Sequence, residues 1–90
     1  MDVDLRLALQ QHQRGCLEEA GRLYQNILAS RPDNSEALHL LGVVAHQQRR
    51  HEPAIQLIER AIALNPGRAA YHANLAEANR AAGKFDRAAS

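Results

Sequence analysis

Apolar residues along the chain recur at helical spacing, in segments that are separated by short polar stretches. The clearest two segments run from about residue 37 to 48 and from about residue 53 to 64, with apolar residues three and four positions apart. Each segment is long enough for a helix of about three turns. Two such helices joined by a short polar turn predict a helical hairpin.

The same arrangement returns every 34 residues. A shift by that interval places similar residues on one another: Leu7 on Leu41 and Leu75, Ala8 on Gly42 and Ala76, His12 on His46, Ala20 on Ala54 and Ala88, and Pro32 on Pro66. Equal residue size at a fixed interval indicates a repeated packing unit. We therefore predict an all-α fold in which antiparallel helical hairpins stack as an α-solenoid. One domain, 1–90, would contain units at 1–34 and 35–68 and a truncated unit at 69–90.

Helix ends are marked by proline and by capping residues. Pro disfavours a helical conformation in the residue before it, so Arg31 and Asn65 are expected to end helices. The next helix can take its N-cap from Asp33, Asn34 or Ser35. Asp33 together with Glu36 would form a capping box.

The turn inside each hairpin falls at the same position of every unit. Pro53 fits the first turn of a helix, where its missing N–H matters little, so the turn of the second unit lies near residues 49–52. Gly15 and Gly83 occupy this position in the first and third units, and Gly adopts the left-handed conformation without strain. Arg49 stands there in the second unit, at a small cost in stability.

Composition narrows the range of functions. Eleven Lys and Arg against ten Asp and Glu give a net charge of +1, which is not typical of a protein that binds nucleic acid. No apolar stretch approaches the roughly 20 residues that span a bilayer, and the acidic start is unlike a signal peptide. We therefore expect a cytoplasmic protein without membrane contact. Cys16 is the only cysteine, so no disulfide can form within the chain.

The 34-residue helix-turn-helix unit resembles the tetratricopeptide repeat. The residues that carry the resemblance are Leu7, Ala8, Ala20, Tyr24, Ile27 and Pro32 in the first unit, Leu38, Leu41, Gly42, Ala45, Ala54, Ile58, Ala61 and Pro66 in the second, and Tyr71, Leu75, Ala76, Gly83, Phe85 and Ala88 in the third. The chain departs from the family pattern because the aromatic residues of the first helices are missing and Gly21 lies inside a second helix.

Two histidines of the second unit lie on one stripe of its first helix. At 100° per residue, His39 and His46 are about 20° apart, opposite the arc that holds Leu38 and Leu41. This stripe is expected to face outward. In the family that the chain resembles, the stripe lines a concave surface that binds extended or helical peptides.

A metal site is the alternative for these histidines. His39 and His46 are about 10 Å apart along the helix axis, whereas zinc needs ligands that converge at roughly 2 Å. His12 could join them from the neighbouring helix, but no Cys, Asp or Glu completes a set of four ligands. We therefore expect no metal and no other cofactor.

The corresponding stripes of the three units form the candidate partner-binding surface. Its members are Leu5, Leu9, His12, His39, Val43, His46, Asn74, Glu77 and Arg80. The mixture of apolar, imidazole and charged groups suits an amphipathic partner. The family members that clamp acidic tails use Lys and Asn where this chain has Leu5, Leu9 and Leu40, so that activity is not expected. Asn74 resembles asparagines that bind the backbone of a peptide, and a solvated or capping amide is the alternative.

Three functions remain open. The first is a protein-protein interaction module that binds a peptide or a partner helix, which we expect not to be an enzyme, since no nucleophile constellation or phosphate loop is evident. The second is the substrate-recruiting repeat region of a larger bacterial enzyme, because the repeats are similar to those that precede O-linked N-acetylglucosamine transferase-type glycosyltransferase domains. The third is a self-assembling scaffold.

Self-association is expected at the C-terminal end of the array. The third unit offers only residues 85–90 for its second helix, and isolated helices below about 12 residues are marginal in water. An uncovered apolar face would then remain for contact with a second copy of the chain. Its expected members are Leu75, Ala78, Ala82 and Phe85.

Overall fold

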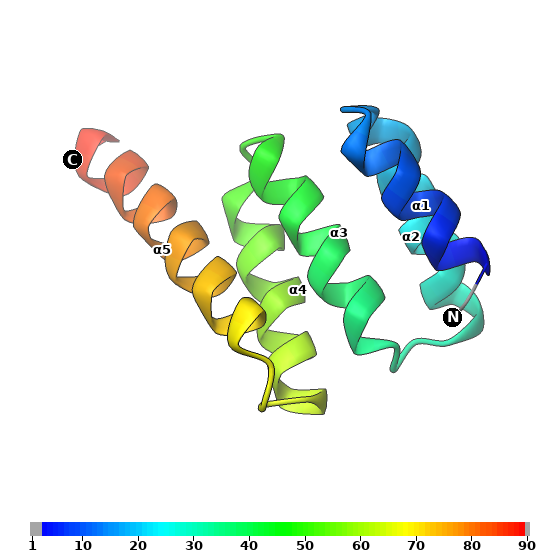
Figure 1. Cartoon of the computed structure of the whole chain (residues 1–90). Coiled ribbons are helices and arrows are strands. Elements are labelled where there is room, and N and C mark those ends of the chain that lie inside the picture. The colour runs from blue at the N-terminus through cyan, green and yellow to red at the C-terminus, as the bar shows by residue number, and fades with distance from the viewer. Residues whose placement is uncertain (1–2, 90) are drawn as a thin grey trace.

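The computed structural model describes residues 3–89, with side chains for residues 4–83, and this part of the chain contains five helices and no strand. The helices are α1 (Val3–Gln13), α2 (Leu17–Ser30), α3 (Ser35–Gln47), α4 (His51–Leu64) and α5 (Ala69–Ala89). Figure 1 shows them in chain order from the blue N-terminal end to the red C-terminal end. The predicted all-α fold is therefore confirmed. None of these helices is long and apolar enough to cross a membrane.

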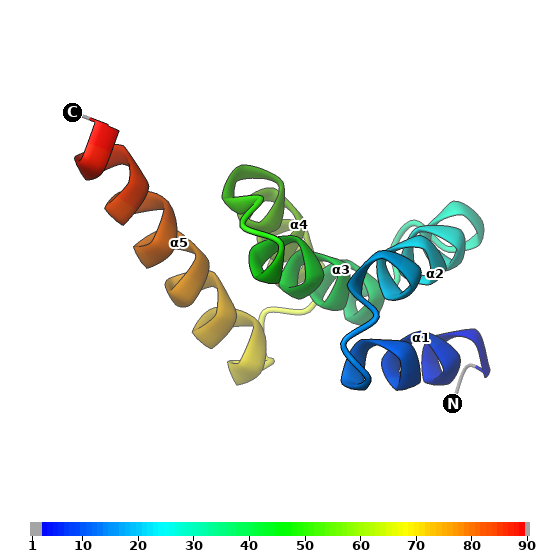
Figure 2. The ribbon, with the colours of Figure 1, turned by 90° about the horizontal axis from the view of Figure 1, so that it is seen from above.

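The helices form hairpins that stack along one direction. α1 packs on α2 and α3 packs on α4 within the hairpins, while α2 on α3 and α4 on α5 join successive hairpins. α1, α3 and α5 form one row, and α2 and α4 lie on one side of it (Figure 2). The result is an elongated solenoid of 44 × 28 × 20 Å.

Small residues and single large side chains build the core. Between α1, α2 and α3 the buried residues are Leu5, Ala8, Ala20, Tyr24, Ile27, Ala37 and Val44. Between α3, α4 and α5 they are Leu38, Ala45, Ala54, Ile58, Ala61, Tyr71 and Ala78. Half of these buried residues are alanines, because the helices pack closely on one another and leave little space between them.

The turns inside the hairpins lie where the sequence predicts them. Gly15 has φ of 84° and Arg49 has φ of 64°, so both adopt the left-handed conformation that ends a helix. In the α3–α4 turn the N–H of Arg50 donates to Ala45 O at 2.8 Å and that of Arg49 donates to His46 O at 3.0 Å. These two bonds form a Schellman motif, which satisfies carbonyls at the end of α3.

The predicted helix ends at Arg31 and Asn65 are confirmed, since these two residues are the C-caps of α2 and α4. Asn34 is the N-cap of α3, and its Oδ1 accepts the N–H of Ala37 at 3.0 Å. The predicted capping box of Asp33 and Glu36 is wrong, because Asn34 already holds the first turn.

The predicted turn at Gly83 is also wrong. α5 continues through Gly83 to Ala89. Glycine permits the left-handed conformation but does not require it. At Gly15 and Arg49 the turn is held by a following helix that packs back on the first, and at Gly83 the chain continues as helix at a cost of about 1 kcal/mol relative to Ala.

Two of the four residues expected to form an uncovered C-terminal face, Leu75 and Ala78, are covered by α4. Ala78 is fully buried, and Leu75 packs against the same cluster beside Ile58. They face α4, the preceding second helix, as Leu41 faces α2 one unit earlier, so the prediction that they lack a partner is wrong. Ala82 is half-buried, and the side chain of Phe85 lies outside the described residues.

Arg49 provides a direct test of the turn. Arg49→Gly should stabilise the protein by about 1 kcal/mol, because the left-handed conformation costs a residue with a Cβ about 1 to 2 kcal/mol. For a chain of this size that corresponds to a rise of about 4 to 8 °C in the thermal unfolding midpoint. Gly15→Ala is the matched control and should lower the midpoint by a similar amount. A lower midpoint for Arg49→Gly would contradict this account of the turn.

Two glycines inside helices should respond in opposite ways to alanine. A Cβ at Gly42 would lie 2.7 Å from Ile58 Cγ1 and 3.2 Å from Ala54 O, whereas one at Gly21 would meet Val44 Cγ1 at an ordinary 3.6 Å. Gly42→Ala should destabilise the hairpin by about 1 to 3 kcal/mol through overpacking. Gly21→Ala should stabilise by up to about 1 kcal/mol through helix propensity. Urea unfolding of both variants measures the difference, and equal effects would show that the α3–α4 contact tolerates a methyl group.

Candidate ligand-binding face

Residues 34 positions apart form rows across α1, α3 and α5. We use the term first-helix face for two of these rows together with Asn74: Leu9, Val43 and Glu77 in one row, and His12, His46 and Arg80 in the other. The members on α1 and α3 and Asn74 on α5 are half-buried, whereas Glu77 and Arg80 are exposed. Arg80 Nη1 lies 2.9 Å from Glu77 Oε1, and both side chains are exposed. The face changes from apolar and imidazole groups to a charged pair along the array.

Two residues expected on the outward stripe are buried instead. Leu5 is 7% exposed and His39 is 6% exposed. Leu5 belongs to the core between α1, α2 and α3, and His39 lies beneath α5, where its ring stacks on Tyr71. The prediction that these residues face outward is wrong for both. Neighbouring segments cover α1 and α3 on more than the side that packs against the second helix of the same hairpin. Helix periodicity specifies the angle of a residue but not how far neighbouring helices wrap round it.

His12 connects the first unit to the second. Its Nδ1 lies 3.1 Å from Tyr24 Oη, and its Nε2 lies 2.8 Å from Gln47 Oε1 on α3. Both ring nitrogens therefore have partners inside the protein. Burial raises the pKa of Tyr24 to about 12, with a smaller contribution from the negative charge of Glu36. Tyr24 thus stays neutral, and its hydroxyl group can form a hydrogen bond with His12.

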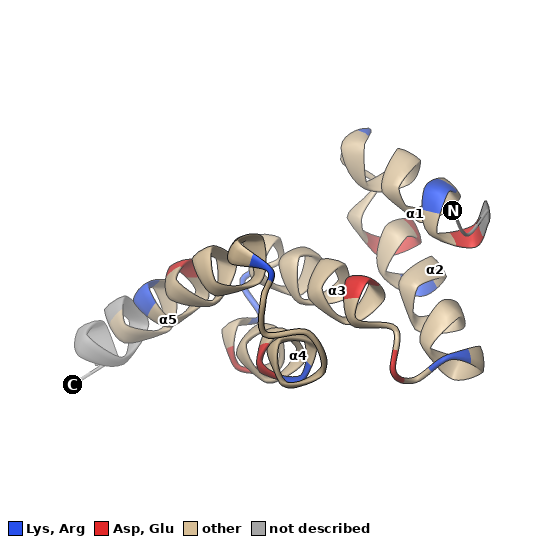
Figure 3. Cartoon of the chain, turned by 60° about the horizontal axis from the view of Figure 1, so that its bottom comes forward, with Lys and Arg blue, Asp and Glu red and all other residues tan. Residues whose placement is uncertain are grey.

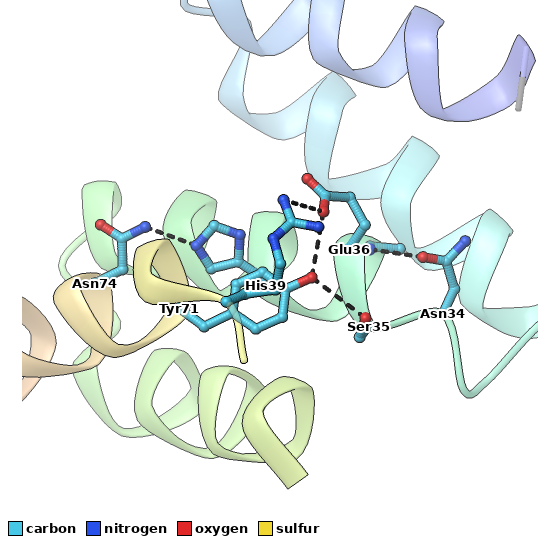
Figure 4. Close-up of polar contacts among 8 residues, drawn as sticks. Asn34, Ser35, Glu36, His39, Tyr71 and Asn74 are labelled. Atoms are coloured by element: carbon cyan, nitrogen blue, oxygen red, sulfur yellow. Dashed lines mark hydrogen bonds and ion pairs between the residues drawn. The ribbon is translucent and has the colours of Figure 1, made fainter. Parts of the chain in front are cut away.

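A second group of polar contacts joins α3 to the start of α5 (Figure 4). Tyr71 Oη donates to Glu36 Oε1 at 3.2 Å and lies 3.2 Å from Ser35 Oγ. Arg68 Nη2 lies 3.3 Å from the same Glu36 oxygen, and the guanidinium carbon lies 5.3 Å from the centre of the Tyr71 ring. Sequence analysis missed this role of Glu36 and Arg68, because they are 32 positions apart and only the hairpin packing brings them together.

His39 and Asn74 form the closest polar contact between α3 and α5. Asn74 Nδ2 lies 2.6 Å from His39 Nε2, and the His39 ring centre lies 4.4 Å from that of Tyr71. Asn74 is half-buried as a whole residue. Burial lowers the pKa of His39, and Arg68 adds to this effect while Glu36 opposes it.

No histidine cluster with metal-site geometry is found in the described part of the chain, where no three His, Cys, Asp or Glu side chains come together. The His46 ring faces that of His51 across the α3–α4 turn, with ring centres 5.6 Å apart. His39 and His46 do not converge, because His39 contacts α5 and His46 contacts the turn. Two imidazoles supply fewer ligands than the four that zinc usually binds.

A groove of about 340 Å³ lies on the other side of the row, between α2 and α4. It is lined by Leu41 and Val44 of α3, by Gln48 just after α3, by Gln25 of α2 and by Leu57 of α4. The sequence did not predict this groove, since its walls come from two second helices that do not contact each other within one repeat. In the ribbon of Figure 3 the acidic (red) and basic (blue) positions are scattered over the helices and do not gather on one of them.

Comparison with known proteins agrees with this geometry. A family model described as tetratricopeptide repeat matches residues 11–77. A solved structure of a mutant O-GlcNAc transferase from Thermobaculum terrenum superimposes with a TM-score of 0.88 at 38% sequence identity over 93% of this chain. The match covers only 16% of that transferase chain. A search of curated proteins finds no match.

The family match runs from the end of α1 through α2, α3 and α4 into α5, and the similar solved structure extends the likeness to nearly the whole chain. The chain belongs to the tetratricopeptide repeat family.

Proposed function

We propose that this chain is a protein-interaction module that binds a peptide or a partner helix on the first-helix face. Tetratricopeptide repeats are generally protein-interaction modules and are typically non-catalytic. The observation that carries the proposal is that Leu9 and Val43 hold the same repeat position on α1 and α3 and are both half-buried, while Glu77 and Arg80 form an exposed ion pair on α5.

The chemistry of the face suggests an amphipathic ligand. Leu9 and Val43 are half-buried and contribute apolar surface, whereas Glu77 and Arg80 are exposed and carry opposite charges. A ligand would place an apolar side chain over α1 and α3 and polar groups over α5. Asn74 adds an amide that can hydrogen-bond a peptide backbone, which is a group that every peptide sequence presents.

A second candidate is the repeat region of a larger bacterial enzyme that recruits protein substrates. The similarity to the Thermobaculum terrenum O-GlcNAc transferase over 93% of this chain favours it. In that case the first-helix face would bind the protein that the enzyme modifies. The coding sequence beyond Ser90 distinguishes the candidates, because a glycosyltransferase domain there would support the second one.

Aspartate substitutions can locate the binding surface. A peptide is first selected from a displayed random library on the purified chain, and its affinity is then measured by calorimetry for Val43→Asp on the face and Gln25→Asp in the groove between α2 and α4. Val43→Asp should weaken binding by more than about 1 kcal/mol, or at least fivefold, because it buries a charge against the apolar part of the ligand. Gln25→Asp introduces the same charge at an exposed site and should leave the affinity within about twofold.

Circular dichroism of both variants confirms that the helices are intact. Loss of binding in Gln25→Asp with full binding in Val43→Asp would assign the ligand to the groove between α2 and α4 and contradict the proposal. Equal losses in both folded variants would also contradict it.

A further inference from the structure

His39 is a buried histidine that the proposed binding face does not use directly. It is 6% exposed, and the two contacts that fix its ring, the stacking on Tyr71 and the bond to Asn74, both come from α5. Its Nδ1 is buried and has no hydrogen-bond partner among the described residues. Nε2 therefore bonds to Asn74, whereas Nδ1 has no hydrogen-bond partner among the described residues.

The protonation state of this ring decides how Asn74 is held. Asn74 Nδ2 donates to His39 Nε2 at 2.6 Å, and a ring nitrogen can accept this bond only when it carries no proton. In the imidazolium form both nitrogens are donors. The Asn74 amide must then rotate by 180° to offer Oδ1 to His39, or the bond is lost.

The surroundings of His39 favour the neutral ring. Burial of the ring disfavours the charged form. The missing acceptor at Nδ1 does not separate the two forms, because a neutral ring whose Nε2 accepts from Asn74 also carries its proton on Nδ1. The charged groups that act on the ring are Glu36 on its own helix and Arg68 just before α5, while Tyr71 is the titratable group in contact with it. Arg68 already places a positive charge over the Tyr71 ring, so a second cation there is disfavoured.

We infer that His39 is a positioning residue, which fixes the Asn74 amide with its Nδ2 toward α3 and its Oδ1 toward the first-helix face, and which reverses that amide when it is protonated. At neutral pH the face then presents an acceptor, suited to the backbone N–H of a peptide. In acid it presents the Asn74 NH₂ group instead. The consequence for a ligand rests on the proposed function, but the orientation itself can be measured without any ligand.

Nuclear magnetic resonance of the uniformly ¹⁵N-labelled chain tests the orientation. Long-range ¹H–¹⁵N spectra should show an unprotonated Nε2 of His39 at pH 7.5, with the proton on Nδ1. Between pH 7.5 and 4.5 the side-chain NH₂ signals of Asn74 should shift together with the His39 ring. The midpoint of this shift should lie below the ordinary histidine value of about 6.5, because burial lowers the pKa of His39.

Two substitutions separate positioning from packing. His39→Gln keeps an acceptor for Asn74 Nδ2 but does not titrate, so the Asn74 signals should lose their pH dependence. His39→Phe keeps a ring on Tyr71 but offers no acceptor, so the Asn74 signals should resemble those of an unbonded amide at every pH. His72→Gln is the control, since His72 is an exposed histidine of α5 that bonds to Pro66 O at 2.9 Å; it should preserve the coupled titration of His39 and Asn74.

Stability gives a second measurement of the same group. A histidine whose pKa is lower in the folded state than in the unfolded state stabilises the fold fully at a pH above the unfolded pKa of about 6.5. This contribution to the free energy of unfolding is lost as the pH falls from that value toward the folded pKa. The thermal midpoint should therefore drop more in the wild type than in His39→Gln between pH 7.5 and 5, and His72→Gln should behave as the wild type.

The inference is overturned if Nε2 of His39 carries the proton at pH 7.5, because Asn74 would then already present its oxygen to α3. It is equally overturned if the Asn74 signals do not move through the titration of His39, or if His39→Gln keeps the pH dependence of the wild type. None of these outcomes depends on a ligand, so each leaves the proposed binding function to be judged by the aspartate substitutions alone.

Discussion

Gly42 allows α3 to approach α4 until there is no room for a side chain between them. A Cβ at this position would lie 2.7 Å from Ile58 Cγ1 and 3.2 Å from the carbonyl oxygen of Ala54. The same position in the first unit is Ala8, which is fully buried. This close approach sets the distance between the two helices of the hairpin. It thereby sets the angle at which the next hairpin can pack, because α5 rests on α4 and α3 together.

Close packing of small residues leaves little apolar surface between successive first helices. Polar contacts take that place: His12 bonds to Gln47 between α1 and α3, and His39 bonds to Asn74 between α3 and α5. These contacts are directional, so they fix the orientation of neighbouring helices more strictly than apolar packing does. They also remove groups from the first-helix face that would otherwise be available to a ligand. The face is consequently less polar between α1 and α3 than the sequence suggests.

The first-helix face would bind a ligand through two kinds of interaction, apolar contact and hydrogen bonding. Val43 and Leu9 would act through apolar contact, which is insensitive to pH. Asn74 would act through a hydrogen bond whose direction His39 controls. A ligand that uses both would lose only part of its affinity in acid, whereas a ligand anchored at Val43 alone would lose none. The pH dependence of binding therefore reports how much of the interface lies over α5.

The sequence by itself determined the repeat, the helix ends at Arg31 and Asn65 and the turns at Gly15 and Arg49. The 34-residue interval, Pro32, Gly15 and the proline at position 53 are local signals, and each acts through the backbone of its own segment, so no tertiary information was needed to interpret them. The turn predicted at Gly83 failed for the complementary reason. A glycine permits a turn, but only a helix that packs back can hold one.

Tertiary structure alone decided which residues of the outward stripe are accessible. His39 and His46 differ by about 20° around the helix axis, yet one is buried beneath α5 and the other lies at the α3–α4 turn. Sequence spacing places a side chain on a face of its own helix. The spacing does not specify the distance to the neighbouring helix. That distance depends on how Gly42, Ile58 and Tyr71, which come from three different segments, pack together. For that reason the fold could be predicted from the sequence, while the partners of His39 and the orientation of Asn74 could not.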